Sequence, residues 1–171
     1  MNEFVKKWLF YSMLFLLGIF AAYIAKKNKQ KEATIEQRQV LPSMKFKNLQ
    51  GKPLKITPKR SVAVIYFHPD CDYCAREMDY IRENIDALAE SEIVLISSAD
   101  QKSTIPFVKE KGVDQFDNVK IGIDENDTFY HTFASRMIPS IFLYDQQGRL
   151  LKFYKGETSI ETILKYLNKD A

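Results

Sequence analysis

Both cysteines of this chain lie at a junction between a buried strand and an amphipathic helix. Residues 61–67 form an almost unbroken apolar run, which predicts a strand buried on both faces of a sheet. Apolar residues spaced by four and three then predict one face of a helix: Cys74, Met78, Ile81, Ile85 and Leu88. Pro69 and Asp70 lie between the two elements and predict a turn, with Asp70 as the helix N-cap.

This position has a chemical consequence for Cys71 and Cys74. The first turn of a helix carries unpaired backbone N–H groups and the positive end of the helix dipole. Both favour the thiolate, which is the form of cysteine that attacks a disulfide. We expect Cys71 to be exposed at the tip of the helix and Cys74 to be covered on its apolar face. The pair is therefore a candidate site for thiol–disulfide chemistry.

A long apolar stretch lies near the N-terminus. Residues 8–25 contain no charge, and at about 1.5 Å per residue a helix of this length spans roughly 27 Å, close to the hydrocarbon core of a membrane. Trp8, Tyr11 and Tyr23 lie towards its ends, where aromatic rings favour the membrane interface. We interpret residues 1–7 as a short tail and residues 8–25 as an uncleaved single-pass anchor. A cleaved signal peptide and a buried core helix are the alternatives.

Charge is distributed unevenly along the chain. The sequence has 25 Lys and Arg against 22 Asp and Glu, and six of the lysines precede residue 32, together with one acid, Glu3. The remainder is mildly acidic and shows no nucleic-acid surface. Two lysines precede the apolar stretch and four follow it, so charge alone does not decide which side of the membrane holds the domain. Two cysteines exclude a scaffold of several disulfides.

The residues after the apolar stretch predict a polar spacer and one α/β domain. We place the spacer at residues 26–40 and the domain at residues 41–171, with Leu41-Pro42 at the boundary. A hairpin is expected within 44–57, and further elements follow: strands at 93–96, 119–123, 141–144 and 150–154, and helices at 104–111, 128–134 and from 160. Because strands alternate with helices before a late antiparallel hairpin, we expect a mixed sheet with helices on both faces.

The arrangement resembles the thioredoxin fold over roughly residues 41–168. The matching features are the buried strand, the Cys-x-x-Cys sequence at the next helix start, and Ile138-Pro139 before the final hairpin. The leading hairpin, 44–57, and the extra strand and helix at 119–134 resemble the redoxin branch. Within that branch the chain is most similar to membrane-tethered, TlpA-like thiol-disulfide oxidoreductases. The resemblance implies a thioredoxin-like domain with an N-terminal β-hairpin and a central βα insertion, preceded by one transmembrane helix.

The resemblance also implies roles for individual residues. Cys71 would be the nucleophile that forms a mixed disulfide with a partner protein, and Cys74 would be the thiol that resolves it. Pro139 would be cis and packed against the cysteines, and the backbone of Ile138 would bind the substrate peptide. Tyr73 lies between the cysteines, where we expect it to be partly exposed and to shape the docking surface.

A glutamate and two aspartates bear on the chemistry of the pair. The acid that thioredoxin buries in its central strand is absent, which leaves Glu77 as the nearest candidate base for the second cysteine. The alternative for Glu77 is an ordinary solvated residue. Asp70 and Asp72 flank Cys71 and oppose its thiolate, while the helix end and Arg76 favour it. If the acids prevail, the protein is a reductant, and this is the direction that we expect.

Three other functions compete with this interpretation. A peroxiredoxin needs Pro and Thr seven and three residues before its reactive cysteine, and Val64 and His68 stand there. A copper or zinc chaperone could use the cysteines with His68 or His131, although copper carriers on this fold usually have three residues between their cysteines. A tethered binding domain without catalysis is the third.

The expected function is reduction of protein disulfides outside the cytoplasm. The resemblance implies an extracytoplasmic domain on a single-pass anchor, recharged by a thiol electron donor in the membrane. A tether raises the effective concentration of the domain near such a donor. The expected partners are disulfide-containing proteins, the donor and the membrane, with no nucleic acid, no cofactor and no bound metal.

Overall fold

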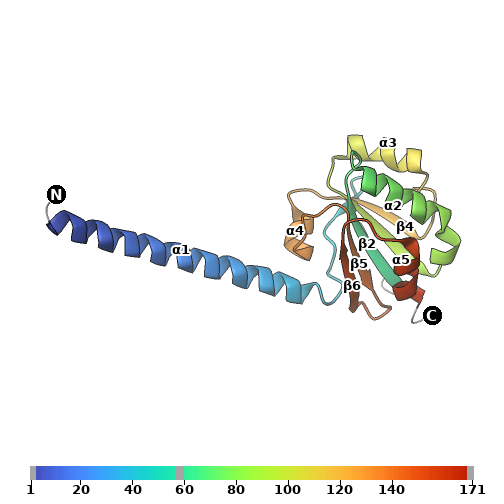
Figure 1. Cartoon of the computed structure of the whole chain (residues 1–171). Coiled ribbons are helices and arrows are strands. Elements are labelled where there is room, and N and C mark those ends of the chain that lie inside the picture. The colour runs from blue at the N-terminus through green and yellow to red at the C-terminus, as the bar shows by residue number, and fades with distance from the viewer. Residues whose placement is uncertain (1–2, 57–59, 169–171) are drawn as a thin grey trace. The chain divides into compact units, whose positions relative to one another are not determined.

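The N-terminal part of the chain is one long helix. The computed structural model describes residues 3–56 and 60–168, and these divide into two units between Glu36 and Gln37. Helix α1 (Glu3–Gln37) makes up the described part of the first unit and ends one residue beyond it (Figure 1). Its segment Lys7–Gln30 is long and apolar enough to cross a membrane, and none of it is buried. The buried-core-helix alternative is therefore wrong, and the polar residues up to 37 continue the same helix.

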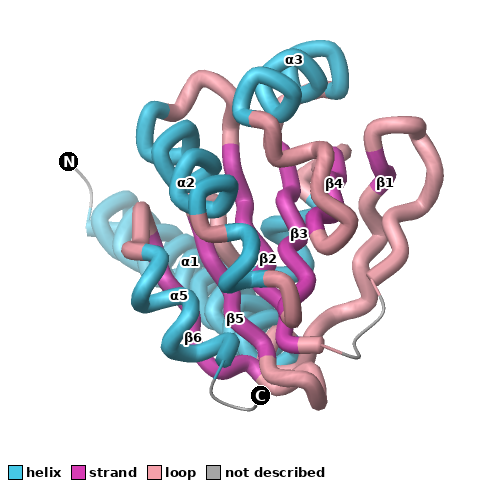
Figure 2. The backbone as a smooth tube through the Cα atoms, turned by 90° about the vertical axis from the view of Figure 1, so that its right-hand side faces the viewer, coloured by secondary structure: helices cyan, strands magenta, loops and turns pink. Residues whose placement is uncertain are grey.

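A mixed sheet forms the centre of the second unit. In the described residues it has six strands in the order β1-β4-β3-β2-β5-β6. They are β1 (Lys47–Asn48), β2 (Ser61–Phe67), β3 (Ser91–Ser97), β4 (Val119–Ile123), β5 (Ser140–Tyr144) and β6 (Leu150–Lys155). Strands β2, β3 and β4 are parallel, whereas β1, β5 and β6 run antiparallel to their neighbours. In Figure 2 the strands run from β6 on the left to β1 on the right.

Successive residues of β2 contribute to two apolar clusters, one on each face of the sheet. Ala63, Ile65 and Phe67 pack with residues of α2 (Asp72–Glu83), α3 (Gln101–Lys111) and α5 (Ile160–Leu167). Val62, Val64 and Tyr66 pack with α4 (Thr128–Phe133) and with Phe46 and Leu54. Figure 1 shows α4 on one side of the sheet and the other three helices on the opposite side. The predicted mixed sheet with helices on both faces is confirmed.

The expected hairpin at 44–57 is less regular than predicted. Strand β1 has two residues and pairs with β4, while Lys47 forms only an isolated bridge with Pro53. Proline has no N–H to donate, so a regular ladder cannot continue through this position. The side chain of Asn48 closes the turn by accepting hydrogen bonds from the backbone N–H groups of Gln50 and Lys52. The predicted end at Thr57 lies outside the described residues.

Two helices differ from their predicted bounds by more than one residue. The periodic pattern predicted one continuous helix to Leu88, but α2 ends at Glu83 and a 3₁₀ helix, η1 (Ile85–Leu88), follows. Helix α3 begins three residues earlier than predicted. Its N-cap is Asp100, whose carboxylate accepts a hydrogen bond from the backbone N–H of Ser103 at 2.8 Å.

The chain enters the second unit alongside the β5–β6 turn. The backbone N–H of Leu41 donates to the carbonyl of Gly148 at 2.6 Å. Arg38 donates to the carbonyl of Phe133 at 2.8 Å and places its guanidinium 4.6 Å from the centre of the Phe153 ring. The domain start at residue 41 stays a prediction, and contacts with the folded unit begin three residues before it.

Candidate active site

Cys71, where β2 leads into α2, is itself the N-cap of α2. Its sulfur accepts a hydrogen bond from the backbone N–H of Cys74 at 3.3 Å. The backbone N–H of Cys71 donates to the carbonyl of His68 at 3.2 Å, which sets the turn. The prediction that Asp70 is the N-cap is therefore wrong: the turn places the Cys71 sulfur, and not the exposed Asp70 carboxylate, over the first N–H groups.

The two thiols differ in access and in ionisation. Cys71 is half-buried, whereas Cys74 is completely buried against Met78 and the rest of the apolar cluster on this face. Burial raises the pKa of the Cys74 thiol, and the hydrogen bond with Cys71 raises it further; a backbone hydrogen bond with His68 acts in the opposite direction. A partner molecule can therefore reach Cys71, while Cys74 stays protonated until a base removes its proton.

Glu77 is a buried carboxyl on the same face of α2 as Cys74. None of its surface is exposed, so the solvated-residue alternative is wrong. Its Oε2 accepts a hydrogen bond from the backbone N–H of Thr158 at 3.2 Å, and its Oε1 is buried without a hydrogen-bond partner among the residues that the structure describes. Burial raises the pKa of Glu77 to about 7; the Thr158 bond opposes this shift, and the charge of Glu157 adds to it. The carboxyl can thus take up or release a proton near neutral pH.

The Ile138-Pro139 peptide bond is cis. Pro139 is buried, and its carbonyl accepts a hydrogen bond from the backbone N–H of Gly156 at 2.9 Å. Ile138 packs against the same apolar cluster as Cys71. Next to it, Met137 is 51% exposed, and Tyr73 between the cysteines is 57% exposed. These two side chains offer apolar surface to solvent, and Met137 is a candidate contact residue that the sequence pattern did not indicate.

The connection between β6 and α5 is the part of the site that the sequence did not reveal. Arg76 was expected to favour the Cys71 thiolate. Instead its guanidinium forms two hydrogen bonds to the carboxylate of Glu157, at 2.9 and 3.0 Å, and lies 4.7 Å from the centre of the Tyr73 ring. Arg76 and Glu157 are 81 residues apart in the chain, so no local pattern relates them.

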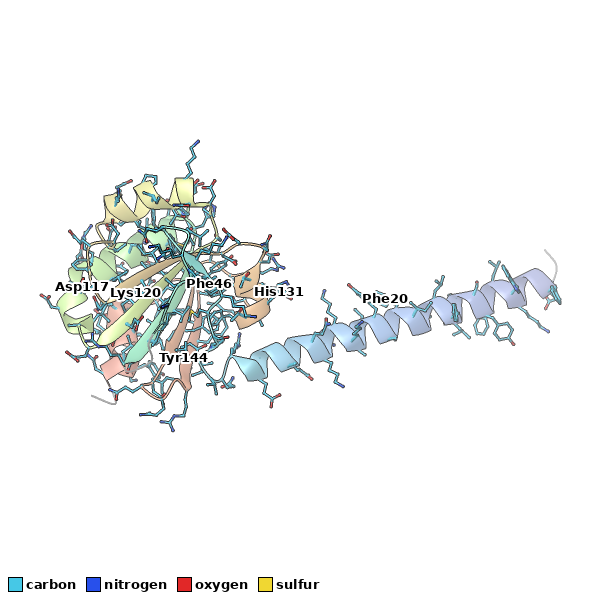
Figure 3. The ribbon with its side chains drawn as sticks, turned by 180° about the vertical axis from the view of Figure 1, so that it is seen from behind. Phe20, Phe46, Asp117, Lys120, His131 and Tyr144 are labelled. Carbon is cyan, nitrogen blue, oxygen red and sulfur yellow. The ribbon has the colours of Figure 1, made fainter. Side chains whose placement is uncertain are left out.

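The structure does not bring His131 to the cysteines. His131 is an exposed residue of α4, which covers the sheet face opposite α2 (Figure 3). The ring of His68 accepts a hydrogen bond from the backbone N–H of Asp70 at 3.1 Å. Within residues 3–56 and 60–168, no three His, Cys, Asp or Glu side chains gather in a way that could hold a metal ion.

A protein-family model identifies the family to which this chain belongs. The family model of the AhpC/TSA family matches residues 38–153, more than half of the chain. The chain belongs to the AhpC/TSA family. This AhpC/TSA chain therefore belongs to the thioredoxin-like redoxins, as the resemblance implied.

Relatives of this AhpC/TSA chain include named oxidoreductases. The thiol-disulfide oxidoreductase ResA of Bacillus thuringiensis subsp. konkukian is 26% identical over 160 residues, which cover 92% of this chain and 91% of that protein. ResA of Geobacillus thermodenitrificans is 23% identical over 160 residues, with 91% and 90% covered.

Solved structures confirm the thioredoxin-like fold. StoA from Bacillus subtilis has a TM-score of 0.58 at 17% identity, covering 73% of this chain and 98% of its own. A secreted Mycobacterium tuberculosis disulfide oxidoreductase homologous to E. coli DsbE has a TM-score of 0.63 at 17% identity, covering 78% and 97%. At these sequence identities, the similarity to the solved structures shows the fold of this chain alone.

We predict that Glu77 lowers the folding stability as the pH rises. Its pKa is about 7 in the folded protein against 4.5 as a free side chain, so between these values the folded state binds more protons than the unfolded state. The free energy of unfolding therefore falls across this window and is constant above it. The difference in pKa corresponds to on the order of 3 kcal/mol.

Urea unfolding of the reduced full-length protein at several pH values measures this loss. We expect Glu77→Gln to remove it, because glutamine does not titrate. Glu83→Gln is the matched control, since Glu83 lies on the same helix with an exposed side chain, and it should leave the pH dependence unchanged. Equal pH dependence in wild type and Glu77→Gln would contradict the assignment.

Proposed function

We propose that this protein is a membrane-anchored thiol-disulfide oxidoreductase that reduces disulfides of extracytoplasmic proteins. One observation carries the proposal: the accessible Cys71 sulfur occupies the N-cap position of α2, with the buried Cys74 one turn later. Helix N–H groups then stabilise the negative charge on the sulfur that a partner can reach. The ResA relatives, which carry the name thiol-disulfide oxidoreductase, support the same activity.

The geometry supports exchange in two steps. The Cys71 thiolate attacks one sulfur of the partner's disulfide; a Cys71–partner disulfide forms, and the partner's other sulfur leaves as a thiolate. Cys74 then attacks the Cys71 sulfur, which releases the second partner thiolate and closes the Cys71–Cys74 disulfide. Two electrons pass from the dithiol to the partner, and the released thiolates take up protons.

Glu77 is the base that we propose for the second step. Burial keeps Cys74 protonated, so the resolving attack needs a proton acceptor inside the protein. Glu77 lies three residues later on the same helix face, has a free buried oxygen, and has a pKa of about 7. It can therefore accept the Cys74 proton when the mixed disulfide forms and release it afterwards.

Charges around Cys71 support the reductive direction. Asp70 and Asp72 are exposed on either side of it, and Arg76, the nearest cation in sequence, is bound to Glu157. The acids oppose the thiolate and so destabilise the dithiol form relative to the disulfide. A dithiol of this kind gives up its electrons more readily.

We further propose that the domain is extracytoplasmic and that a thiol electron donor in the membrane returns its disulfide to the dithiol form. Structural disulfides persist mainly outside the cytoplasm, where a disulfide reductase finds substrates. The Mycobacterium tuberculosis protein of the same fold is described as secreted. The apolar segment Lys7–Gln30 supplies a span of sufficient length to hold the domain at the membrane.

The peroxidase alternative lacks support, because Val64 stands where a peroxiredoxin has its proline and is buried in β2.

Replacing the resolving cysteine should trap substrates. In Cys74→Ser the first attack still occurs, but the mixed disulfide cannot be resolved, so partner proteins should remain bound through Cys71. Non-reducing electrophoresis of membranes from expressing cells, followed by reduction, measures these adducts. Cys71→Ser is the matched control and should trap none. Equal trapping by both variants would contradict the assigned order of attack.

The direction of transfer is measured by redox titration of the full-length protein in detergent. We expect a midpoint well below about −120 mV, the value of strong disulfide oxidases. Asp72→Asn should raise the midpoint by up to about 30 mV, which corresponds to a tenfold change in the exchange equilibrium, because loss of the acid favours the dithiol. Asp86→Asn, an exposed control beyond the end of α2, should not. A midpoint near that of the oxidases would refute the reductase.

The topology is tested by labelling intact cells with a membrane-impermeant thiol reagent. If the domain is extracytoplasmic, reduced wild-type protein should be labelled at Cys71 without permeabilisation. Cys71→Ser should stay unlabelled, because Cys74 is fully buried. Labelling that requires permeabilised cells would place the domain in the cytoplasm.

A further inference from the structure

Three consecutive residues after β6 each contact a different part of the candidate active site. The backbone N–H of Gly156 donates to the carbonyl of Pro139, at 2.9 Å. The carboxylate of Glu157 binds Arg76, which lies next to Glu77 in the chain. The backbone N–H of Thr158 donates to Oε2 of Glu77, at 3.2 Å. We call residues 156–158 the bridging segment.

The backbone of the bridging segment is not held by a regular element. Strand β6 ends at Lys155 and α5 begins at Ile160. Gly156 has a φ of +94°, a conformation that residues with a side chain rarely adopt. The side-chain anchor of the segment on α2 is the pair between Arg76 and Glu157, in which two parallel hydrogen bonds fix both distance and orientation.

We propose that Arg76 and Glu157 are positioning residues for the resolving step, because their ion pair holds the bridging segment so that the Thr158 N–H stays bonded to Glu77. The proposal rests on the proposed function, in which Glu77 accepts the proton of Cys74. Arg76 and Glu157 bind each other and do not act on the reacting sulfurs directly. They act through the hydrogen bond from the Thr158 N–H to Oε2 of Glu77. This bond orients the carboxyl, and within the described residues it leaves Oε1 available to accept a proton.

Loss of Arg76 and loss of the Glu157 charge should change the pKa of Glu77 by different amounts. The Thr158 bond lowers the pKa of Glu77, whereas the charge of Glu157 raises it. Loss of Arg76 removes one anchor of the bridging segment, which weakens the Thr158 bond, and also leaves Glu157 without its counter-ion, so both effects raise the pKa of Glu77. Loss of the Glu157 charge removes the same anchor but also removes the repulsion between the two carboxylates, so its two effects on the pKa of Glu77 oppose each other. Other titratable groups near this network are the thiol of Cys71, which caps α2, and the thiol of Cys74 together with Tyr73 and Tyr80 on α2; none of these residues is replaced in either variant.

The resolving step can be followed by reaction of the reduced full-length protein with 5,5′-dithiobis(2-nitrobenzoate). Attack by Cys71 releases one thionitrobenzoate and leaves the other on the Cys71 sulfur. Attack by Cys74 on that mixed disulfide releases the second. The rate of the second release against pH reports the base, and the first release is an internal control for Cys71.

We expect Arg76→Gln to shift the pH midpoint of the second release upward by about half a unit, which makes this release about threefold slower below the midpoint. Glu157→Gln should shift it less. Arg76→Lys, which keeps the charge without the two parallel hydrogen bonds, should lie between wild type and Arg76→Gln. Arg82→Gln is the matched control, because Arg82 lies on the same helix and pairs with Asp79, and it should behave as wild type.

Two outcomes separate this inference from the proposed function. If Glu77→Gln keeps the wild-type midpoint, Glu77 is not the base and the proposed mechanism fails. If Glu77→Gln abolishes the midpoint but Arg76→Gln matches Arg82→Gln, the mechanism stands and the positioning role is wrong. Adding Arg76→Gln to Glu77→Gln should change the second release no further. Should Arg76→Gln fail to fold, Arg76→Lys and Glu157→Gln give the same comparison.

Discussion

The hydrogen bond from the Cys74 backbone N–H to the Cys71 sulfur sets the rest of the site. It places one sulfur at the start of α2, where helix N–H groups converge, and turns the other into the apolar cluster beneath the helix. The same helix register carries Glu77 into that cluster. This local interaction therefore decides which thiol is accessible and which is covered, and the helix that it starts carries Glu77 to the buried side.

Burial raises the pKa of Glu77 towards neutral pH, and it also lowers the stability of the folded protein when this carboxyl is charged. A carboxyl without solvent favours its neutral form, and within residues 3–56 and 60–168 the Thr158 N–H is the single hydrogen-bond donor to Glu77 that offsets this. In the proposed mechanism, the protein retains this destabilising group at the point where a proton moves near neutral pH. Functional sites commonly accept such a cost, because an ordinary solvated glutamate is a poor acceptor for a buried thiol proton.

Local patterns predicted the elements well where burial alone determines them. Strand β4 matches its predicted bounds, and β2 was predicted from its continuous apolar run because parallel strands in this sheet are covered on both faces. The patterns failed where a specific hydrogen bond decides. Asp100 starts α3 early, and the Cys71 sulfur displaces Asp70 as the cap of α2. Pro53 limits the leading hairpin to a bridge.

The sequence by itself determined the strand–helix junction with its two thiols, the uncharged apolar helix near the N-terminus and the resemblance to redoxins. These features depend on residue spacing and composition over short stretches of the chain, so local sequence patterns are enough to predict them. Only the tertiary structure decided that Glu77 is buried rather than solvated and that Arg76 binds Glu157 rather than the thiolate. The reason is that the β5–β6 hairpin lies beside β2 in the sheet, so the segment that follows it reaches α2 from a distant part of the chain.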